Sequence, residues 1–499
     1  MSGIKKLAGQ TIWYGASSIA ARFINYLLLP YLTYKLSKAI YGEFSLVYSF
    51  IPFMNVVFTY GMETAYFRFS NSKDKETVYN TTSISLIFTS IVLGVLLILM
   101  RQPIANLLSV GNHPEYIIVA AGIIAIDALC SIPFARLRQE SRPVKFALTK
   151  ISGILINIAA TYFFISTIPH FLTTHPTHWF NDFYDPNWSV GYLLLANLVQ
   201  NVFVLLLLSK EFFGFKWKFD WSLWKELMAY GMPLIIAGFA GMINETFDRI
   251  MLQWWAPVAS VDAAKAEVGI YAACYKLAML ISLAVQAFKM GAEPFFFKQS
   301  ADKDAPKLYA RIMKFFVITL CIMFLMVALY LDVWKQFIRN PEMWVGLQVV
   351  PILLLANMFL GIYYNLSVWY KLGHKTMAGA WITVIGAGIT LLINYTLIPY
   401  FSYMACAWAT FACYGSMMVI SFIWGQKEYP IPYAWKKLVA YIGIVAGFYL
   451  IQKGVLYFYN PFWFQFVTGS ILLFVFIWFI LLVEKKEFQK LPVVGKYIH

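Results

Sequence analysis

Charged and polar side chains interrupt several apolar stretches of the sequence that are long enough to span a lipid bilayer. Arg22 lies near the middle of the first stretch, and Asn25 and Tyr26 follow it on the same face of a helix. A charge near the bilayer centre costs about 2.5–3.5 kcal/mol, so Arg22 needs a partner or a ligand. Because the guanidinium fork matches the oxygen atoms of phosphate, this face is a candidate site for an anionic group. Pairing with Asp127, at a similar depth in the fourth stretch, is the structural alternative.

The phrase NETFDR places three charged residues close together in the seventh apolar stretch. Glu245 and Arg249 have the spacing of an ion pair on one helix face, and Asp248 directly precedes Arg249. We favour mutual neutralisation that locks neighbouring helices together, and a gate at the outer end is the alternative. In the eighth stretch, Lys276 either extends toward the outer surface or contacts a substrate in a central cavity.

The phrase GMETAYFRF ends the second stretch, and the similar phrase GAEPFFFKQ ends the eighth. Their glutamates, Glu63 and Glu293, lie more than about 30 Å along their helices at 1.5 Å per residue, which places them near the cytoplasmic mouth. Lys289 precedes Glu293 by one helical turn and is placed to neutralise it. We predict that these acids hold the inner rim, and direct coupling to an ion through them is the alternative.

The elements that carry these residues are predicted to be membrane-spanning helices. The chain has 499 residues, of which 13% are charged and 61% hydrophobic, whereas about 25% charged is usual in soluble proteins. Roughly 20 apolar residues cross about 30 Å of hydrocarbon as a helix, while barrel strands need only about 10. We predict fourteen spans, near residues 9–34, 42–67, 78–100, 115–135, 146–168, 189–209, 227–255, 267–297, 311–331, 344–370, 376–399, 402–424, 436–458 and 462–483. The predicted fold class is therefore an all-α polytopic membrane protein.

The net charge of +15 is distributed in a way that indicates how the chain is oriented in the membrane. Most lysines and arginines fall in the segments that share one side of the membrane with both termini, and few fall in the segments on the other side. By the positive-inside rule, the N- and C-termini are predicted to be cytoplasmic. The charge is thereby explained without a nucleic-acid partner, and we predict none.

The first two thirds of the chain contain two copies of one pattern. Tyr14-Gly15 matches Tyr230-Gly231, YGEFSLVYSF resembles VGIYAACYKLAML, and the two Gly-x-Glu phrases follow in the same order. Six spans separate each element from its copy, so the copies keep the same orientation and are parallel repeats. We predict an N-lobe of six spans (1–215), a C-lobe of six spans (216–430), and an appendix of two spans with a cytoplasmic tail (431–499).

No motif for metal binding, nucleotide hydrolysis or covalent catalysis is found in the sequence. The five cysteines form no CxxC pair, and the three histidines of the loop 169–189 lack the spacing of a metal site. Walker, nucleophile-elbow and HExxH motifs do not occur. We therefore predict no metal, no cofactor and no enzyme activity. An integral-membrane polymerase or ligase is the enzyme alternative, but it would need larger outer loops with catalytic bases.

Three segments of the chain resemble a known family: YGASSIAARFINYLLLPYLTYKLSKAIYGEFSL, YGMPLIIAGFAGMINETFDRIML and VGIYAACYKLAML. They are similar to the polysaccharide-transporter branch of the multidrug, oligosaccharidyl-lipid and polysaccharide exporters, the Wzx-type flippases. The resemblance implies two lobes of six helices, a central cavity and alternating access. It does not identify the sugar, because substrates vary within that branch.

The resemblance and the embedded charges together predict the function. We expect a flippase that moves a polyprenyl-diphosphate-linked oligosaccharide across the bacterial inner membrane, driven by a gradient of H⁺ or Na⁺ or by the membrane potential. The expected partners are the lipid-linked substrate, membrane lipids, a polysaccharide polymerase and glycosyltransferases. A cation-coupled multidrug exporter and a lipid II flippase are the alternatives.

Overall fold

The computed structural model describes residues 19–489 apart from positions 21, 22, 25, 177, 301, 303, 374 and 460, and it leaves the side chains at 291, 293, 294, 297 and 298 undescribed. Within this part of the chain every regular element is a helix. Thirteen of these helices are long and apolar enough to cross a membrane, which confirms the all-α polytopic fold. The predicted first span, 9–34, lies mostly outside the described residues, so the predicted count of fourteen stays a prediction.

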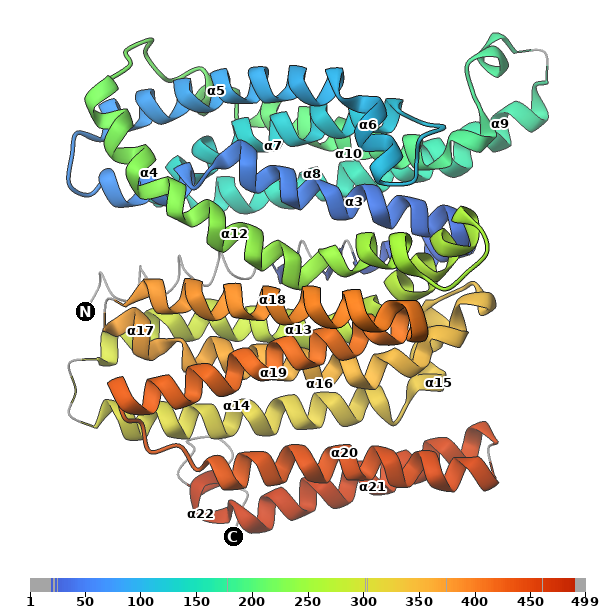
Figure 1. The fold of residues 1–499 in the computed structure, drawn as a ribbon, viewed down its shortest axis with the longest axis vertical. Coiled ribbons are helices and arrows are strands. Elements are labelled where there is room, and N and C mark those ends of the chain that lie inside the picture. The colour runs from blue at the N-terminus through green and yellow to red at the C-terminus, as the bar shows by residue number, and fades with distance from the viewer. Residues whose placement is uncertain are drawn as a thin grey trace.

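The helices form two lobes and a C-terminal pair (Figure 1). The N-lobe contains α2 (Leu28–Lys35), α3 (Lys38–Thr59), α4 (Met62–Phe69), α5 (Lys75–Leu99), α6 (Arg101–Leu107), α7 (Glu115–Gln139), α8 (Pro143–Tyr162), α9 (Ile168–Thr174), α10 (Ser189–Leu207) and α11 (Ser209–Phe212). The C-lobe contains α12 (Trp221–Trp255), α13 (Val261–Gln299), α14 (Ala305–Ala328), α15 (Leu331–Trp334), α16 (Val350–Leu366), α17 (Val368–Leu372), α18 (Thr376–Phe401) and α19 (Tyr403–Glu428). Then follow α20 (Trp435–Phe458), α21 (Phe462–Val483) and α22 (Lys485–Phe488).

Several long helices begin at a side chain that caps the first turn. Ser37 accepts a hydrogen bond from the amide of Ile40 at the start of α3, and Asp220 accepts one from Leu223 at the start of α12. Such caps satisfy amides that have no partner within the helix, and each contributes about 1 kcal/mol. The caps define where the loops end and the apolar spans begin.

The same pairs of helices pack in both lobes. In the N-lobe, α3 packs on α7, α7 on α10, and α8 on α10. In the C-lobe, the helices in the same order along the chain repeat this pattern, because α13 packs on α16, α16 on α19, and α18 on α19. The helices thus pack in the same order in the two halves of the chain.

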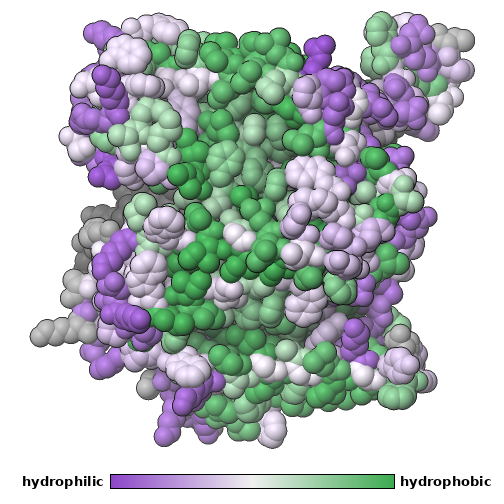
Figure 2. Space-filling model, viewed as in Figure 1, coloured by the Kyte–Doolittle hydropathy of each residue, from purple (hydrophilic) through white to green (hydrophobic). Residues whose placement is uncertain are grey.

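Hydropathy divides the surface into a middle band and two ends. Figure 2 shows hydrophobic residues over the middle of the molecule and hydrophilic residues gathered toward its left and right ends. In the same view, α4, α17 and α22 lie at the left end, and α6, α9 and α15 lie at the right end (Figure 1). We call the first the basic end, because most lysines and arginines of the loops lie there, and the second the far end. The apolar band between them is the part that faces lipid.

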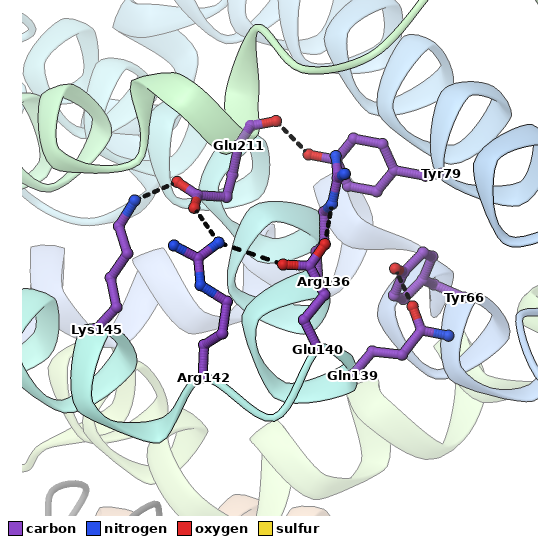
Figure 3. Close-up of polar contacts among 8 residues, drawn as sticks. All are labelled: Tyr66, Tyr79, Arg136, Gln139, Glu140, Arg142, Lys145 and Glu211. Atoms are coloured by element: carbon purple, nitrogen blue, oxygen red, sulfur yellow. Dashed lines mark hydrogen bonds and ion pairs between the residues drawn. The ribbon is translucent and has the colours of Figure 1, made fainter.

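An ion-pair cluster ties the basic ends of the N-lobe helices together (Figure 3). The carboxylate of Glu211, which is 4% exposed, accepts hydrogen bonds from Arg142 at 2.8 Å and Lys145 at 2.6 Å. Glu140 joins Arg142 to Arg136, at 3.2 and 2.7 Å. The cluster holds the end of α10 against the α7–α8 corner. Glu211 is the buried member of this cluster, and its charge is tolerated because two cations donate hydrogen bonds to the carboxylate.

A buried glutamate at the end of α21 helps to anchor the C-terminal pair to the C-lobe. Glu484 accepts hydrogen bonds from Lys314 at 2.7 Å, from Tyr441 at 2.7 Å and from Lys437 at 3.2 Å. Lys314 belongs to α14, whereas Tyr441 and Lys437 belong to α20. This contact, with the packing of α14 on α20 and α21, attaches the appendix to the outside of the C-lobe.

Candidate functional site: a cavity between the lobes

A cavity of about 500 Å³ lies between the two lobes in the half of the molecule nearer the far end. Helices α2, α3, α8 and α10 of the N-lobe line one side, and α12, α13, α16 and α19 of the C-lobe line the other. Its polar lining is rich in amides and hydroxyls, from Ser45, Tyr48, Ser49, Asn157, Thr161, Asn197, Gln200, Thr246, Tyr275, Ser282, Gln286, Asn357 and Tyr414. We call this the central cavity. A polar cavity at membrane depth is a place for a polar solute, because lipid-facing surface is apolar.

Charged side chains in the central cavity come from the C-lobe. Among the described residues that line it, Arg249 and Lys276 are cationic and Glu245 is anionic. Arg249 extends from α12 over the ring of Tyr275 on α13, with its guanidinium carbon 4.6 Å from the ring centre. Two cations thus face the cavity, and the carboxylates of Glu245 and Asp248 balance their formal charge.

Arg249 is held in place by Asp248. The guanidinium donates to the Asp248 carboxylate at 3.2 Å and to the backbone carbonyl of Glu245 at 2.9 Å. The hydroxyl of Tyr271 on α13 donates to the other Asp248 oxygen at 2.6 Å. Asp248 is 3% exposed and Arg249 is 8% exposed. The aspartate therefore neutralises part of the cation and links α12 to α13.

Hydrogen bonds between polar side chains also link neighbouring helices on both walls of the cavity. The amide of Asn197 on α10 donates to the hydroxyl of Tyr48 on α3 at 3.0 Å. On the opposite wall, Ser282 of α13 donates to the amide oxygen of Asn357 on α16 at 2.7 Å. The hydroxyl of Tyr26 is buried and has no hydrogen-bond partner among the described residues. Donors and acceptors of this kind suit a hydroxyl-rich ligand.

Beyond the central cavity, toward the far end, α3 and α13 cross at glycines. A Cβ at Gly42 would lie 1.8 Å from the carbonyl oxygen of Lys265, and a Cβ at Gly269 would lie 1.9 Å from the carbonyl oxygen of Lys38. Only glycine permits backbones to approach this closely. The crossing therefore closes the space between the lobes at this level. We call it the far-end crossing.

An ion pair reinforces the far-end crossing. Lys265 of α13 donates to Glu43 of α3 at 2.6 Å, and the two side chains are 11% and 14% exposed. Asp262 lies 3.7 Å from the same ammonium group. Removing Lys265 would leave the Glu43 carboxylate without compensation, at a cost of about 3–5 kcal/mol for a buried pair. The pair thus stabilises the closed arrangement.

At the basic end, α4 packs on α12. Gly61, with φ +73°, turns the chain between α3 and α4, and a Cβ there would lie 2.9 Å from the carbonyl oxygen of Gly231. Lys73 pairs with Glu226 at 2.6 Å, and the Arg68 guanidinium lies 4.4 Å from the ring centre of Tyr230. The two lobes are therefore joined at the basic end through α12.

A second cavity, of about 340 Å³, lies within the C-lobe toward the basic end. Helices α12, α13, α16, α17, α18 and α19 line it. Its lining includes Lys289, whose ammonium is 4.4 Å from the ring centre of Tyr364, and Lys371. Glu245, Leu360 and Tyr414 line both this cavity and the central cavity, so the two share a wall. We call it the basic-end cavity.

The structure brings some of the predicted site residues together. Tyr26, Lys276, Glu245 and Arg249 line the central cavity, and Asp248 lies directly behind Arg249. Arg22 and Asn25 lie outside the described residues, as does the side chain of Glu293.

The other predicted residues lie away from the central cavity. Glu63 pairs with Arg138 of α7 at the basic end, and Lys289 lines the basic-end cavity. Asp127 is on α7 and is not among the residues that line the central cavity; it interacts with Lys150 on α8 and with the amides of Asn55 and Asn201. These residues therefore belong to separate environments.

Reasoning from the sequence missed three groups of residues that the structure places in important positions. Glu43 and Lys265 reinforce the far-end crossing, Lys371 lines the basic-end cavity, and the amides of Asn157, Asn197, Gln200, Gln286 and Asn357 line the central cavity. The repeat alignment contains a signal for the crossing, because it matches Gly42 with Gly269 and Lys38 with Lys265. No signal in the sequence identifies Lys371, since basic residues are common in the loops at that end.

Comparisons with known proteins agree with this architecture. A family model described as "Polysaccharide biosynthesis protein" matches residues 7–300. A protein of Haemophilus influenzae, "Lsg locus putative protein 1", is 22% identical over 303 residues, which are 60% of this chain and 68% of the relative. Another protein from the same bacterium, an "Uncharacterized membrane protein", is 21% identical over 57% of this chain and 64% of its own length.

Solved structures share the fold. The inward closed conformation of the lipid II flippase MurJ superimposes with a TM-score of 0.67, with 12% identity, over 95% of this chain and 99% of that chain. An inward-facing multidrug resistance transporter of the MATE family, of the MOP superfamily, has a TM-score of 0.60 with 14% identity, over 85% and 96% of the two chains. At these identities, the likeness concerns the arrangement of the helices.

Proposed function

The chain belongs to the polysaccharide biosynthesis protein family, within the MOP superfamily of membrane transporters and flippases, and from this premise we propose that it flips a lipid-linked oligosaccharide. The proposed substrate is a polyprenyl-diphosphate-linked repeat unit of O-antigen, capsule or exopolysaccharide. Its proposed location is the bacterial inner membrane, with the basic end and both termini in the cytoplasm.

One observation carries the proposal: the central cavity combines two cations with many amides and hydroxyls. Arg249 and Lys276 suit a diphosphate, since charge-assisted hydrogen bonds to phosphate are the strongest that these side chains make. The uncharged polar lining suits the hydroxyl groups of a glycan. The polyprenyl tail remains in the lipid, where burial of its apolar surface from water is already complete.

Release to the far side requires the far-end crossing to separate. The glycine contacts between α3 and α13 and the Glu43–Lys265 pair join the lobes there. In the proposed cycle, these contacts break and the lobes separate at the far end while they stay joined at the basic end, so that the cavity then faces the outside. Packed interfaces of this kind have discrete alternative arrangements, which supports a two-state motion.

Transport against a concentration difference needs an energy source. We propose coupling to H⁺, Na⁺ or the membrane potential, with embedded acids such as Asp127, Glu245 and Asp248 as candidate ion-binding groups. Imposing a pH, Na⁺ or potential difference across proteoliposome membranes, one at a time, tests this part. A flipping rate that responds to none of them contradicts it. We also propose that a polymerase and glycosyltransferases act after and before this protein.

Reconstitution tests the function directly. The full chain is placed in proteoliposomes with a fluorescent polyprenyl-diphosphate disaccharide, and a membrane-impermeant reductant reports how much label reaches the outer leaflet with time. We expect flipping by the wild type, a roughly 10–100-fold lower rate for Lys276→Met, and substantial recovery for Lys276→Arg, since a charged hydrogen bond contributes about 1.5–3 kcal/mol. Equal rates for all three proteins would remove Lys276 from the mechanism. No flipping by the wild type would contradict the proposed function.

A lipid II flippase is the second candidate, supported by the TM-score of 0.67 to MurJ. The same assay with fluorescent lipid II distinguishes the two, because a dedicated lipid II flippase should move lipid II faster than the disaccharide carrier. Drug export, suggested by the fold of the MATE transporter, is tested by ethidium efflux from cells that produce the protein. Efflux above that of control cells would favour export.

A further inference from the structure

The basic-end cavity has the composition of an anion site. Lys289 of α13 and Lys371 of α17 both line it, and they come from helices that are far apart in the sequence. Tyr363 and Tyr370 also line this cavity, and because their hydroxyls hydrogen-bond to each other at 3.3 Å, the pair offers one further donor to a ligand. Two ammonium groups and neighbouring hydroxyls form a set of donors that suits phosphate oxygens.

The basic-end cavity extends from the basic end of the C-lobe to the wall that it shares with the central cavity. On α12, its lining runs from Pro233 to Glu245, which is about 18 Å at 1.5 Å per residue. Lys371, at the end of α17, lies at the basic end, and the inner limit is the wall shared with the central cavity. Glu245, whose carboxylate also lines the cavity, lies at this wall. The cationic part of the cavity therefore lies nearest the basic end.

The size of the cavity and its apolar residues restrict the kind of ligand that fits. A volume of about 340 Å³ is near the lower limit of small-ligand pockets, which are about 300–1,000 Å³, so the cavity suits a headgroup rather than an oligosaccharide. Leu234, Ala237, Met377 and Met417 give it an apolar side beside the lysines. A diphosphate attached to the first isoprene units of a lipid has both properties.

We propose that the basic-end cavity is a loading subsite that binds the diphosphate of the polyprenyl carrier before the substrate enters the central cavity. Lys289 and Lys371 hold the phosphate oxygens, and the apolar side receives the first isoprene units. This inference rests on the proposed function, and it adds a second site to the central cavity.

Photo-crosslinking tests the subsite. The full chain in detergent is incubated with farnesyl diphosphate that carries a photoreactive group on its isoprenoid chain, and crosslinked peptides are identified by mass spectrometry. Peptides covering 370–383 line only the basic-end cavity, whereas peptides covering 41–49 line only the central cavity. We expect crosslinks in 370–383 that fall roughly tenfold in Lys289→Met and in Lys371→Met, since each loses one charged hydrogen bond.

Matched variants make the result specific. Lys427→Met removes an exposed lysine at the same end of the C-lobe that does not line the cavity, and it should crosslink like the wild type. Lys289→Arg and Lys371→Arg should restore most of the yield. Each variant is first checked for an unchanged elution volume and melting temperature. If a methionine variant unfolds, the competition with phosphatidylglycerol and inorganic pyrophosphate described below still decides.

The outcomes separate this inference from the proposed function. Crosslinks confined to 41–49, unchanged by Lys289→Met and Lys371→Met, would overturn the loading subsite and leave the proposed function intact. No specific crosslink anywhere in the wild type would overturn both. Loss of the 370–383 crosslinks on addition of an equal concentration of phosphatidylglycerol, but not of inorganic pyrophosphate, would show a phospholipid headgroup site and overturn the substrate assignment.

Discussion

Gly42 and Gly269 occupy the same position in the two repeats, and each packs against the backbone of the other's helix. The approach is symmetric, because a Cβ at Gly42 would meet Lys265 and a Cβ at Gly269 would meet Lys38, and these two lysines are also matched in the repeats. An axis that relates the two lobes therefore passes close to the far-end crossing. A movement of one lobe about this axis changes the crossing and the central cavity together, which makes the crossing the natural place to test the proposed cycle.

Adding one methyl group at the crossing should open it. Gly42→Ala places a Cβ where the Lys265 carbonyl oxygen now lies, so α3 and α13 must separate. We expect a cysteine introduced at Thr246, in the central cavity, to react faster with an impermeant maleimide added from outside the cells. The five native cysteines are buried and add little background. Gly388→Ala, where a Cβ meets no atom within 4 Å, is the control and should leave the rate unchanged.

Disrupting the Glu43–Lys265 pair should destabilise the protein only when one partner remains. Lys265→Met alone is expected to lower the free energy of unfolding by about 3–5 kcal/mol, because the Glu43 carboxylate loses its partner. Glu43→Gln alone should cost less, because Asp262 still lies 3.7 Å from the Lys265 ammonium group. The double variant should lose less than the sum of the two single losses. A double-mutant cycle from unfolding of the detergent-solubilised protein measures this coupling.

The exposed pair Lys307–Asp304, with side chains 80% and 75% exposed, provides the comparison for that cycle and should show almost no coupling. Additive losses at Glu43 and Lys265 would mean that the pair does not hold the crossing.

Removing the Tyr271 hydroxyl should loosen the Arg249 site. Tyr271→Phe deletes the donor to the buried Asp248 carboxylate, whose distance is 2.6 Å, and we expect the free energy of unfolding to fall by about 1.5–3 kcal/mol. Tyr34→Phe, at a side chain that is 71% exposed, should have no measurable effect. The two melting curves are compared in the same detergent. Equal stability of Tyr271→Phe and wild type would show that Asp248 is satisfied without this hydroxyl.

Stability at the basic end should depend on pH through Glu211. Burial raises the pKa of its carboxyl, but hydrogen bonds and attraction from Lys145 and Arg142 outweigh this, so the pKa is lowered overall from its ordinary 4.5. A folded-state pKa below the unfolded value means that the stabilisation is complete above about pH 4.5 and is lost as the pH falls through the folded pKa.

Glu211→Gln should therefore be less stable than wild type at pH 7, and the difference should shrink as the pH is lowered below 4.5. Melting temperatures across that range measure it. A difference between the two proteins that stays constant with pH would show that the ionisation of Glu211 does not contribute.

Much of the architecture could be predicted from the sequence, because it depends on local properties. The length of each apolar run determines that it crosses the membrane as a helix, and side chains such as Ser37 and Asp220 determine where helices begin. Parallel repeats follow from the order of matched phrases and an even number of spans between them. The family resemblance rested on such phrases too, and the match over residues 7–300 confirms it.

Which charges share a cavity was decided only by the tertiary structure. The sequence shows that Arg249, Lys276 and Asp127 are all embedded, but helices that are apolar on every side carry no signal for the face that turns inward. Packing between the lobes places Arg249 and Lys276 in the central cavity, and Asp127 among other partners in the N-lobe. Lys371 and Lys289 line one cavity for the same reason. Contacts between helices that are distant in the sequence determine how each helix is rotated about its own axis. Local sequence determined the helices and their repeat, and long-range packing determined the site.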